Sequence, residues 1–175
     1  PVCVTRWVFV QDTLAPVLAL IGDESVDVEQ CGQYDDEGYT VTDNGDYVVA
    51  DGGTWTGSTE TRGSYTITYT ATDNGNNSTT VTRTINIVDT EAPTLEMLGN
   101  AIDTVERWSE YTDAGYSAAD FCNPESEVTV SVGGTFVNTQ SVGLYTITYQ
   151  AEDASGNISS LLTRYVVVEM PVGFG

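Results

Sequence analysis

The sequence contains no histidine and no lysine, so it lacks the side chains that most enzymes use for proton transfer and covalent catalysis. Without them there is no imidazole to act as a general base or metal ligand, and no amine to form a Schiff base. Carboxylate pairs remain, as in glycoside hydrolysis, but such a pair needs a cleft, which small β domains rarely form. The composition therefore predicts a protein that is not an enzyme.

Positive charge is also scarce, because five arginines stand against 26 acidic residues, for a formal net charge of −21. A surface of this sign repels phosphate, so the sequence predicts no nucleic-acid partner, and it disfavours anionic membranes. No run of about eighteen apolar residues is present, which predicts no membrane span. The acidic side chains either keep a threonine-rich β protein soluble by preventing strand edges from pairing, or they bind cations.

The sequence does contain an internal repeat. The segment from Gly63 to Asn76 returns from Gly143 to Asn157, and in both copies large side chains alternate with threonine. This is the period of a strand with one buried face. A glycine lies two residues before Tyr65 and before Tyr145, as in the tyrosine corner of immunoglobulin-like sandwiches, where the hydroxyl bonds to backbone at the entrance to strand F. The sequence therefore predicts an all-β fold of two tandem immunoglobulin-like β-sandwiches.

The linkers define the predicted domain boundaries. Asp-Thr-Leu-Ala-Pro begins at Asp12 and Asp-Thr-Glu-Ala-Pro begins at Asp89, and each proline is expected to open the first edge strand of a domain. Short strand patterns and frequent Gly turns follow, with no helical pattern. The predicted organisation is an orphan strand over 1–11, a first sandwich over 12–88, a second over 89–169 and a tail over 170–175.

The first eleven residues have the pattern of a strand without a domain. The segment from Thr5 to Asp12 aligns with Thr82 to Asp89 and with Thr163 to Glu169, which are the predicted last strands, G, of the two repeats. Either the segment was cut from a longer array of domains, or it is donated as an added strand to a neighbouring molecule. In the second case the donated side chains are those of the apolar run Trp7, Val8, Phe9 and Val10.

Four motifs occur in the same order in both repeats: Asp-Thr-x-Ala-Pro, Tyr-x-Asp-x-Gly-Tyr, Gly-x-Tyr-Thr-Ile-Thr-Tyr-x-Ala-x-Asp with a following Gly-Asn, and Thr-Arg before the last strand. Together they resemble the bacterial surface Ig-like domains, whose relatives are the HYR and cadherin-like modules. The resemblance covers both domains and implies an extracellular or cell-surface location, with neighbouring Ig-like domains or identical subunits as partners. Domain 1 departs from the pattern at Asn74-Gly75-Asn76, where its F–G loop is expected to be one residue shorter than in domain 2.

Aspartates are expected to collect at one end of each sandwich, because the N-terminal linker, the B–C loop and the F–G loop share an end in this architecture. The residues concerned are Asp12, Asp43 and Asp73 in the first domain, and Asp89, Asp120 and Asp153 in the second, with Glu91 beside them. Carboxylate and carbonyl oxygens are ligands for Ca²⁺. Cadherin-like modules, which the sequence resembles, use comparable positions between domains. The alternative is that each aspartate caps a turn, and the sequence leaves both interpretations open.

Three cysteines are too few for a disulfide scaffold and wrongly spaced for zinc. Cys31 follows the second short strand of domain 1, and Cys122 lies in the predicted B–C loop of domain 2, so the two are expected at ends that face each other. We predict a disulfide between them; the alternative is free thiols or bonds to other molecules. Cys3 belongs to the orphan strand, and its partner is expected in the domain that this strand completes.

These features predict a non-enzymatic extracellular structural module, a rigid tandem segment of a surface stalk, adhesin or filament, with polymerisation by strand donation as one version of the hypothesis. The alternatives are a ligand-binding adhesin module and an accessory domain of a secreted enzyme. No feature of the sequence identifies a receptor or glycan. Sequons at Asn76, Asn77 and Asn157 lie in the predicted F–G loops and matter only if the source glycosylates.

Overall fold

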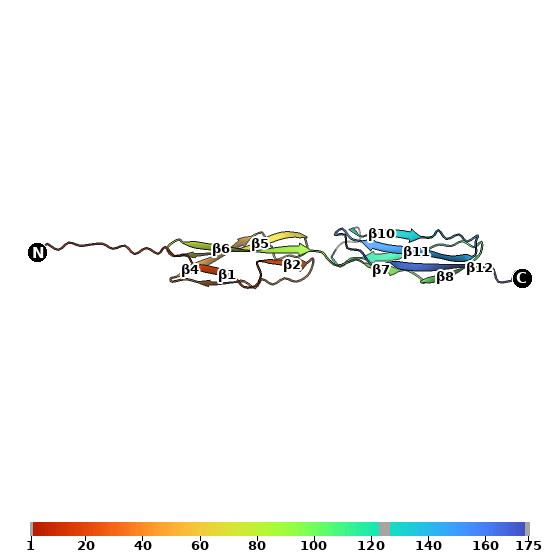
Figure 1. The fold of residues 1–175 in the computed structure, drawn as a ribbon, viewed down its shortest axis with the longest axis horizontal. Helices are drawn as coiled ribbons and strands as arrows, with labels where there is room; N and C mark the ends of the chain where they lie inside the picture. Colours follow the sequence, from red (N-terminus) through yellow and green to blue (C-terminus); the bar gives the residue numbers. More distant parts are fainter. Residues whose placement is uncertain (1, 123–126, 174–175) are drawn as a thin grey trace. The chain divides into compact units, whose positions relative to one another are not determined.

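The computed structural model describes residues 2–122 and 127–173. The chain divides into two compact units, Pro1–Val88 and Asp89–Gly175. Figure 1 shows that each unit is built from layered strands, and the described residues contain no α-helix.

The first unit consists of a two-stranded sheet, in which β1 pairs with β3, and a four-stranded sheet with the order β2-β6-β5-β4. All pairs are antiparallel except β2 with β6, which run parallel along one edge. The strands are β1 (Val17–Leu20), β2 (Ser25–Glu29), β3 (Tyr39–Thr42), β4 (Tyr47–Gly53), β5 (Gly63–Asp73) and β6 (Ser78–Val88). The last strand, β6, therefore lies beside β2, which is near the beginning of the domain.

The second unit repeats this arrangement, with β7 paired to β9 in a small sheet and a four-stranded sheet of order β10-β11-β12-β8. Again the early strand β8 runs parallel to the last strand β12. The strands are β7 (Thr94–Met97), β8 (Ile102–Glu106), β9 (Tyr116–Ala119), β10 (Thr129–Gly134), β11 (Gly143–Glu152) and β12 (Leu162–Glu169). Two sheets per unit and two units confirm the predicted tandem sandwiches.

The alternating repeat explains where the core sits. In β5 the side chains of Ile67, Tyr69 and Ala71 are buried, because residues at a spacing of two share one face of a strand. The intervening threonines face outward, where the Thr68 and Thr82 hydroxyls lie 3.2 Å apart across β5 and β6. Each four-stranded sheet therefore has an apolar inner face and a hydroxyl-lined outer face.

Residues 2–11, expected to form an orphan strand, pair with neither sheet of the first unit. Trp7, Val8, Phe9 and Val10 are 77% to 95% exposed. A strand needs a partner edge for its backbone N–H and C=O groups, and none of the described strands of this unit pairs with the segment. Its completion by another domain or molecule stays a prediction.

Candidate functional sites

Each sandwich contains a buried arginine in its last strand. Arg83 on β6 is 1% exposed and Arg164 on β12 is 0% exposed, although arginine is almost never fully buried without a partner. Arg83 forms an ion pair with Asp36, donates from Nη2 to the carbonyl of Ile21, and donates from Nε to the carbonyl of Asp23 at 2.9 Å. The guanidinium thus ties the last strand to the turn between β1 and β2.

The carboxylate that faces Arg83 also accepts hydrogen bonds from two tyrosines. Tyr34 donates to Asp36 Oδ1 at 3.1 Å, and the buried Tyr69 donates to Asp36 Oδ2. Burial alone would raise the pKa of the Asp36 carboxyl, but hydrogen bonds from Tyr69, Arg83 and Tyr34 outweigh it, so this pKa lies below its usual range. Asp36 is therefore a carboxylate at neutral pH, and burial together with that carboxylate raises the pKa of Tyr69.

Domain 2 repeats the network with one added acidic group. Arg164 pairs with Asp113, which accepts a hydrogen bond from Tyr149 at 2.6 Å, and Arg164 Nη1 lies 3.9 Å from Asp103 Oδ2. Tyr111 donates to Asp103 at 3.0 Å. We call these two sets of side chains the arginine networks: Arg83–Asp36–Tyr69–Tyr34 in domain 1 and Arg164–Asp113–Tyr149–Asp103–Tyr111 in domain 2.

The sequence motifs described above contain these residues, but they did not predict the arginine networks. The signal was present, because an arginine recurs before the apolar strand in both repeats of a chain that has only five. The partner carboxylate is 47 residues away from Arg83, which a local pattern does not reveal. In the sequence, arginine in a half-buried strand also suggests the solvent face.

Tyr65 and Tyr145, predicted as tyrosine corners, each donate a hydrogen bond to the carbonyl four residues earlier. The acceptors are Thr61 and Ser141, and both distances are 3.0 Å. Their side chains are only half-buried, whereas the buried tyrosines of the repeat are Tyr69 and Tyr149. The corner tyrosines therefore fix the loop that enters the long strand, and the core positions lie four residues further along.

Three of the predicted pole aspartates meet in each domain. Asp12, Asp43 and Asp73 bring one carboxylate oxygen each within 4.8 Å of the others, and Asp89, Asp120 and Asp153 do the same. Each set comes from the linker before the first strand, the end of β3 or β9, and the end of the long strand β5 or β11. We call these sets the aspartate poles. Glu91 is exposed and is not part of the second pole.

The aspartate poles also stabilise turns. Asp73 accepts hydrogen bonds from the backbone and the side-chain amide of Asn77, both at 2.8 Å, and Asp153 accepts the same pair from Asn157 at 2.9 Å. The Asn77 side chain lowers the pKa of the Asp73 carboxyl. At Asp153 burial raises the pKa, but hydrogen bonds from Asn157 and neighbouring backbone N–H groups bring it below its usual range. Both groups are thus negative at neutral pH.

The tight turns of the two F–G loops have the same span, but the connection in domain 1 is one residue shorter, as predicted. Tyr69 of β5 pairs with Val81, 12 positions later, whereas its counterpart Tyr149 of β11 pairs with Leu162, 13 positions later. The hydrogen bonds make Asn77, not Asn76, the counterpart of Asn157, because each lies four residues after its aspartate. The left-handed position before it is occupied by Asn76, with φ 63°, in domain 1 and by Gly156, with φ 88°, in domain 2. The additional residue of domain 2 therefore lies after Asn157, and asparagine can take the left-handed position in domain 1 because it tolerates this conformation.

Both cysteines of the predicted pair, Cys31 and Cys122, are in the disulfide form, whereas Cys3 is an exposed free thiol. Cys31 lies in the turn after β2, where its backbone N–H donates to the carbonyl of Thr59 at 2.9 Å. Disulfides persist in oxidising surroundings, so this cysteine chemistry fits a protein outside the cytoplasm. Among the described residues, no helix has the length and apolarity to span a bilayer.

Tandem all-β units with a tyrosine corner and a polar loop end define an immunoglobulin-like class. The family described as "Bacterial surface protein, Ig-like domain" matches residues 18–87 and 95–168, and the chain belongs to this family. This membership confirms the predicted resemblance and the location outside the cell or at its surface.

Relatives include adhesins. The chain is 35% identical over 118 residues to "Serine-rich adhesin for platelets" from Staphylococcus aureus strains MRSA252 and MSSA476, a match that covers 60% of this chain but only 8% and 5% of those proteins. Among solved structures, it is similar to human Protocadherin-24 EC1-2 (13% identity, TM-score 0.34, 91% of this chain and all of that one) and to lipoprotein BT2262 from Bacteroides thetaiotaomicron (24% identity, TM-score 0.38, 46% and 39%). The matched family and the adhesin relatives are both described as surface proteins or adhesins.

Proposed function

We propose that this chain is a non-enzymatic structural segment of a longer cell-surface protein, part of a stalk or adhesin shaft that carries tension. The observation that supports this most is the pairing of the early and last strands of each domain. Five residue pairs join β2 to β6 in parallel, and five join β8 to β12. Tension applied to the two ends of a domain pulls such parallel neighbours in opposite directions, so their evenly spaced hydrogen bonds are loaded together.

The arginine networks support the same role, because each arginine lies on the last strand one residue before the first pair of the parallel ladder, Ser25 with Thr84 or Ile102 with Tyr165. Arg83 joins β6 to the carbonyls of Ile21 and Asp23, just before β2. Arg164 joins β12 to the carbonyl of Leu98, just before β8. Each network therefore adds side-chain bonds to the strands that tension would load.

Single-molecule pulling from the two chain ends, with the disulfide reduced so that the whole chain can extend, tests this function. We expect two separate, abrupt unfolding events, each releasing about 27 nm of chain, from roughly 80 residues at about 3.4 Å each. Gradual extension at low force would overturn the tension-bearing role. Abrupt unfolding of both domains at forces well above those of strand-by-strand peeling would support it.

A second candidate, a module that itself contacts a receptor, is favoured by the identity with platelet adhesins. Platelet binding distinguishes the two candidates, because a shaft segment has no receptor of its own. Purified chain that bound platelets saturably would favour this second candidate, and lack of binding alongside high unfolding forces would favour the shaft. An accessory module of a secreted enzyme remains the third possibility and predicts that the chain is found fused to a catalytic domain.

Strand donation is proposed as the means by which the segment 1–11 joins other domains. Its support is the alignment of Thr5–Asp12 with β6 and β12, together with the exposure of Trp7, Val8, Phe9 and Val10. Deleting 1–11 should leave both melting transitions unchanged and remove any self-association seen by analytical ultracentrifugation. Unfolding of the shortened chain, or unchanged association, would contradict donation.

We further propose that the aspartate poles bind Ca²⁺. In each pole, three negatively charged carboxylates each bring one oxygen within 4.8 Å of the others. Among the described residues of domain 1, none forms an ion pair with Asp12, Asp43 or Asp73. Carboxylates and backbone carbonyls, such as that of Asp12, are the oxygen ligands that Ca²⁺ takes. The same positions recur in domain 2, which turn formation alone does not require.

Added Ca²⁺ is expected to raise the melting midpoint of both domains. A ligand that binds only the folded state stabilises it by about 2.7 kcal/mol at a hundredfold excess over Kd. Asp73→Asn should reduce the gain of domain 1 and Asp153→Asn that of domain 2, whereas Glu60→Gln, at an exposed position outside the poles, should change neither. Calorimetric titration with no uptake at millimolar Ca²⁺, together with identical melting in chelator, would leave the aspartates as turn formers.

A further inference from the structure

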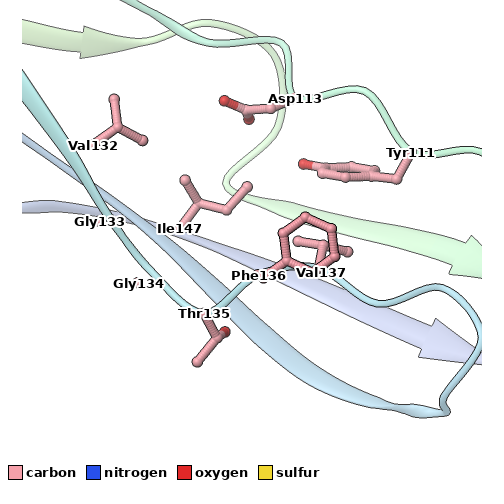
Figure 2. Close-up of a pocket in the computed structure, with 9 residues that line it drawn as sticks. All are labelled: Tyr111, Asp113, Val132, Gly133, Gly134, Thr135, Phe136, Val137 and Ile147. Carbon is pink, nitrogen blue, oxygen red and sulfur yellow. The ribbon is translucent and has the colours of Figure 1, made fainter.

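Domain 2 contains an open cavity beside the four-stranded sheet. It has a volume of about 450 Å³ and lies between the end of β10 and the segment before β9. Figure 2 shows Asp113, Tyr111 and Ile147 around the opening, with Val132 on β10 and with Phe136 and Val137 at its rim. We call this cavity the β10 pocket.

The equivalent place in domain 1 is closed by an indole ring. The turn Gly52-Gly53-Thr54-Trp55 corresponds to Gly133-Gly134-Thr135-Phe136. Trp55 packs edge-on against Tyr34, with ring centroids 5.5 Å apart, and against Tyr65 at 5.9 Å. In domain 2 the residue at this position, Phe136, is 91% exposed and does not cover Tyr111, the counterpart of Tyr34. The β10 pocket is therefore the space that a tryptophan occupies in the sister domain.

The glycine turn before the aromatic residue is the same in both domains, so the two rings differ in their packing rather than in the turn that precedes them. A Cβ on Gly53 would lie 2.1 Å from the carbonyl oxygen of Thr66, so this position requires glycine, and Gly134 faces Thr146 in the same way. In domain 1 the backbone N–H groups of both Thr54 and Trp55 donate to the Thr66 carbonyl, which holds Trp55 against the core. In domain 2 Thr135 N–H donates to the Thr146 carbonyl at 2.7 Å, and the Phe136 side chain that follows is exposed.

The β10 pocket is acidic as well as aromatic. Asp113 keeps 28% of its side chain exposed although it pairs with Arg164, and the nearby Asp103 keeps 21%. The lining contains no basic residue, and the chain carries a net charge of −21. An occupant with positive charge beside its aromatic ring would therefore be attracted, and one with negative charge repelled.

We propose that the β10 pocket binds a tryptophan side chain presented by a basic segment of a partner peptide. The ring would enter between Tyr111, Val132 and Ile147, as Trp55 does in domain 1, with Phe136 covering its outer edge. Basic neighbours of the tryptophan would face the exposed oxygens of Asp113 and Asp103. Tryptophan and arginine are among the residues most enriched at the energetic centres of interfaces, where they fill desolvated pockets.

Titration of the full chain with the capped peptide Arg-Trp-Arg, followed by methyl NMR, tests this proposal. We expect saturable shifts of Val132, Val137 and Ile147, and at least tenfold weaker binding of Arg-Ala-Arg and of Glu-Trp-Glu. Phe136→Ala should weaken binding several-fold, because it removes the covering ring. No shifts at several millimolar Arg-Trp-Arg would overturn the proposal, as would tighter binding by Phe136→Ala, which would mean that Phe136 fills the pocket itself.

The sister domain supplies matched variants. Phe136→Trp should fill the β10 pocket from within and reduce Arg-Trp-Arg binding at least tenfold, while Trp55→Ala should create a second site in domain 1 that takes the same peptide. Undiminished binding by a folded Phe136→Trp chain would place the peptide elsewhere and overturn the proposal. Because Phe136 is exposed, this variant tests the pocket even if Trp55→Ala proves too unstable to study.

Discussion

Replacing Arg83 by methionine is expected to lower the free energy of unfolding of domain 1 by about 3 kcal/mol. Removing one member of a buried pair leaves the other charge without compensation, which typically costs about 3–5 kcal/mol. The lower figure applies because Asp36 keeps 17% of its side chain exposed and can recover some contact with water. The carbonyls of Ile21 and Asp23 also lose their donor. Scanning calorimetry should show the transition of domain 1 shifted down, and that of domain 2 unchanged.

Arg6→Met provides the matched control, because Arg6 is exposed on the segment before the first domain. Its loss should change neither transition by more than about 0.5 kcal/mol, as is usual for surface substitutions. If Arg83→Met were as mild as Arg6→Met, the arginine network would contribute nothing to stability, and its proposed part in resisting tension would lose its support.

Replacing Tyr149 by alanine should destabilise domain 2 by about 3–5 kcal/mol, because a large aromatic side chain is removed from a packed site. Tyr149 is fully buried, packs against Tyr116 with ring centroids 5.4 Å apart, and donates to Asp113. Tyr149→Phe keeps the ring but leaves the Asp113 carboxylate one donor short, which should cost about 1–3 kcal/mol. Urea unfolding of the full chain, analysed for two transitions, measures both variants.

The corner tyrosine of the same strand is the control for this prediction. Tyr145 is half-buried, and its hydroxyl donates a hydrogen bond to the carbonyl of Ser141. Tyr145→Ala should therefore cost clearly less than Tyr149→Ala. The reverse order would show that the corner, and not the interior hydrogen bond to Asp113, holds the second sandwich together.

Strand patterns were predictable because their cause is local. The alternation from Tyr65 to Ala71 places every second side chain on one face, and that face is the buried one. The repeated linkers, loops and strands also predicted that Asp12, Asp43 and Asp73 share an end, and their carboxylates do approach one another. Whether a cation joins them is a matter of affinity, which spacing does not determine.

The arginine networks and the β10 pocket could not be predicted because they depend on distant pairs. Arg164 meets Asp113 across 51 positions of the sequence. The pocket arises from the direction of one aromatic side chain, Phe136, after a glycine turn that has the same residues in both domains. A pattern can show that two positions are equivalent, but only the packing shows that one ring is inside and the other outside.

The asparagines of the F–G loops determine at which residue a domain should begin when it is transferred to another protein. The Asn77 side chain donates to the carbonyls of Asp12 and Leu14, and Asn157 donates to the carbonyl of Asp89, so each loop is bound to the linker that precedes its own domain. A recombinant domain that begins at Pro16 leaves the Asn77 amide with Asp73 alone as acceptor, whereas one that begins at Asp12 keeps the two linker carbonyls as well. The transferable unit is therefore a sandwich together with the linker in front of it.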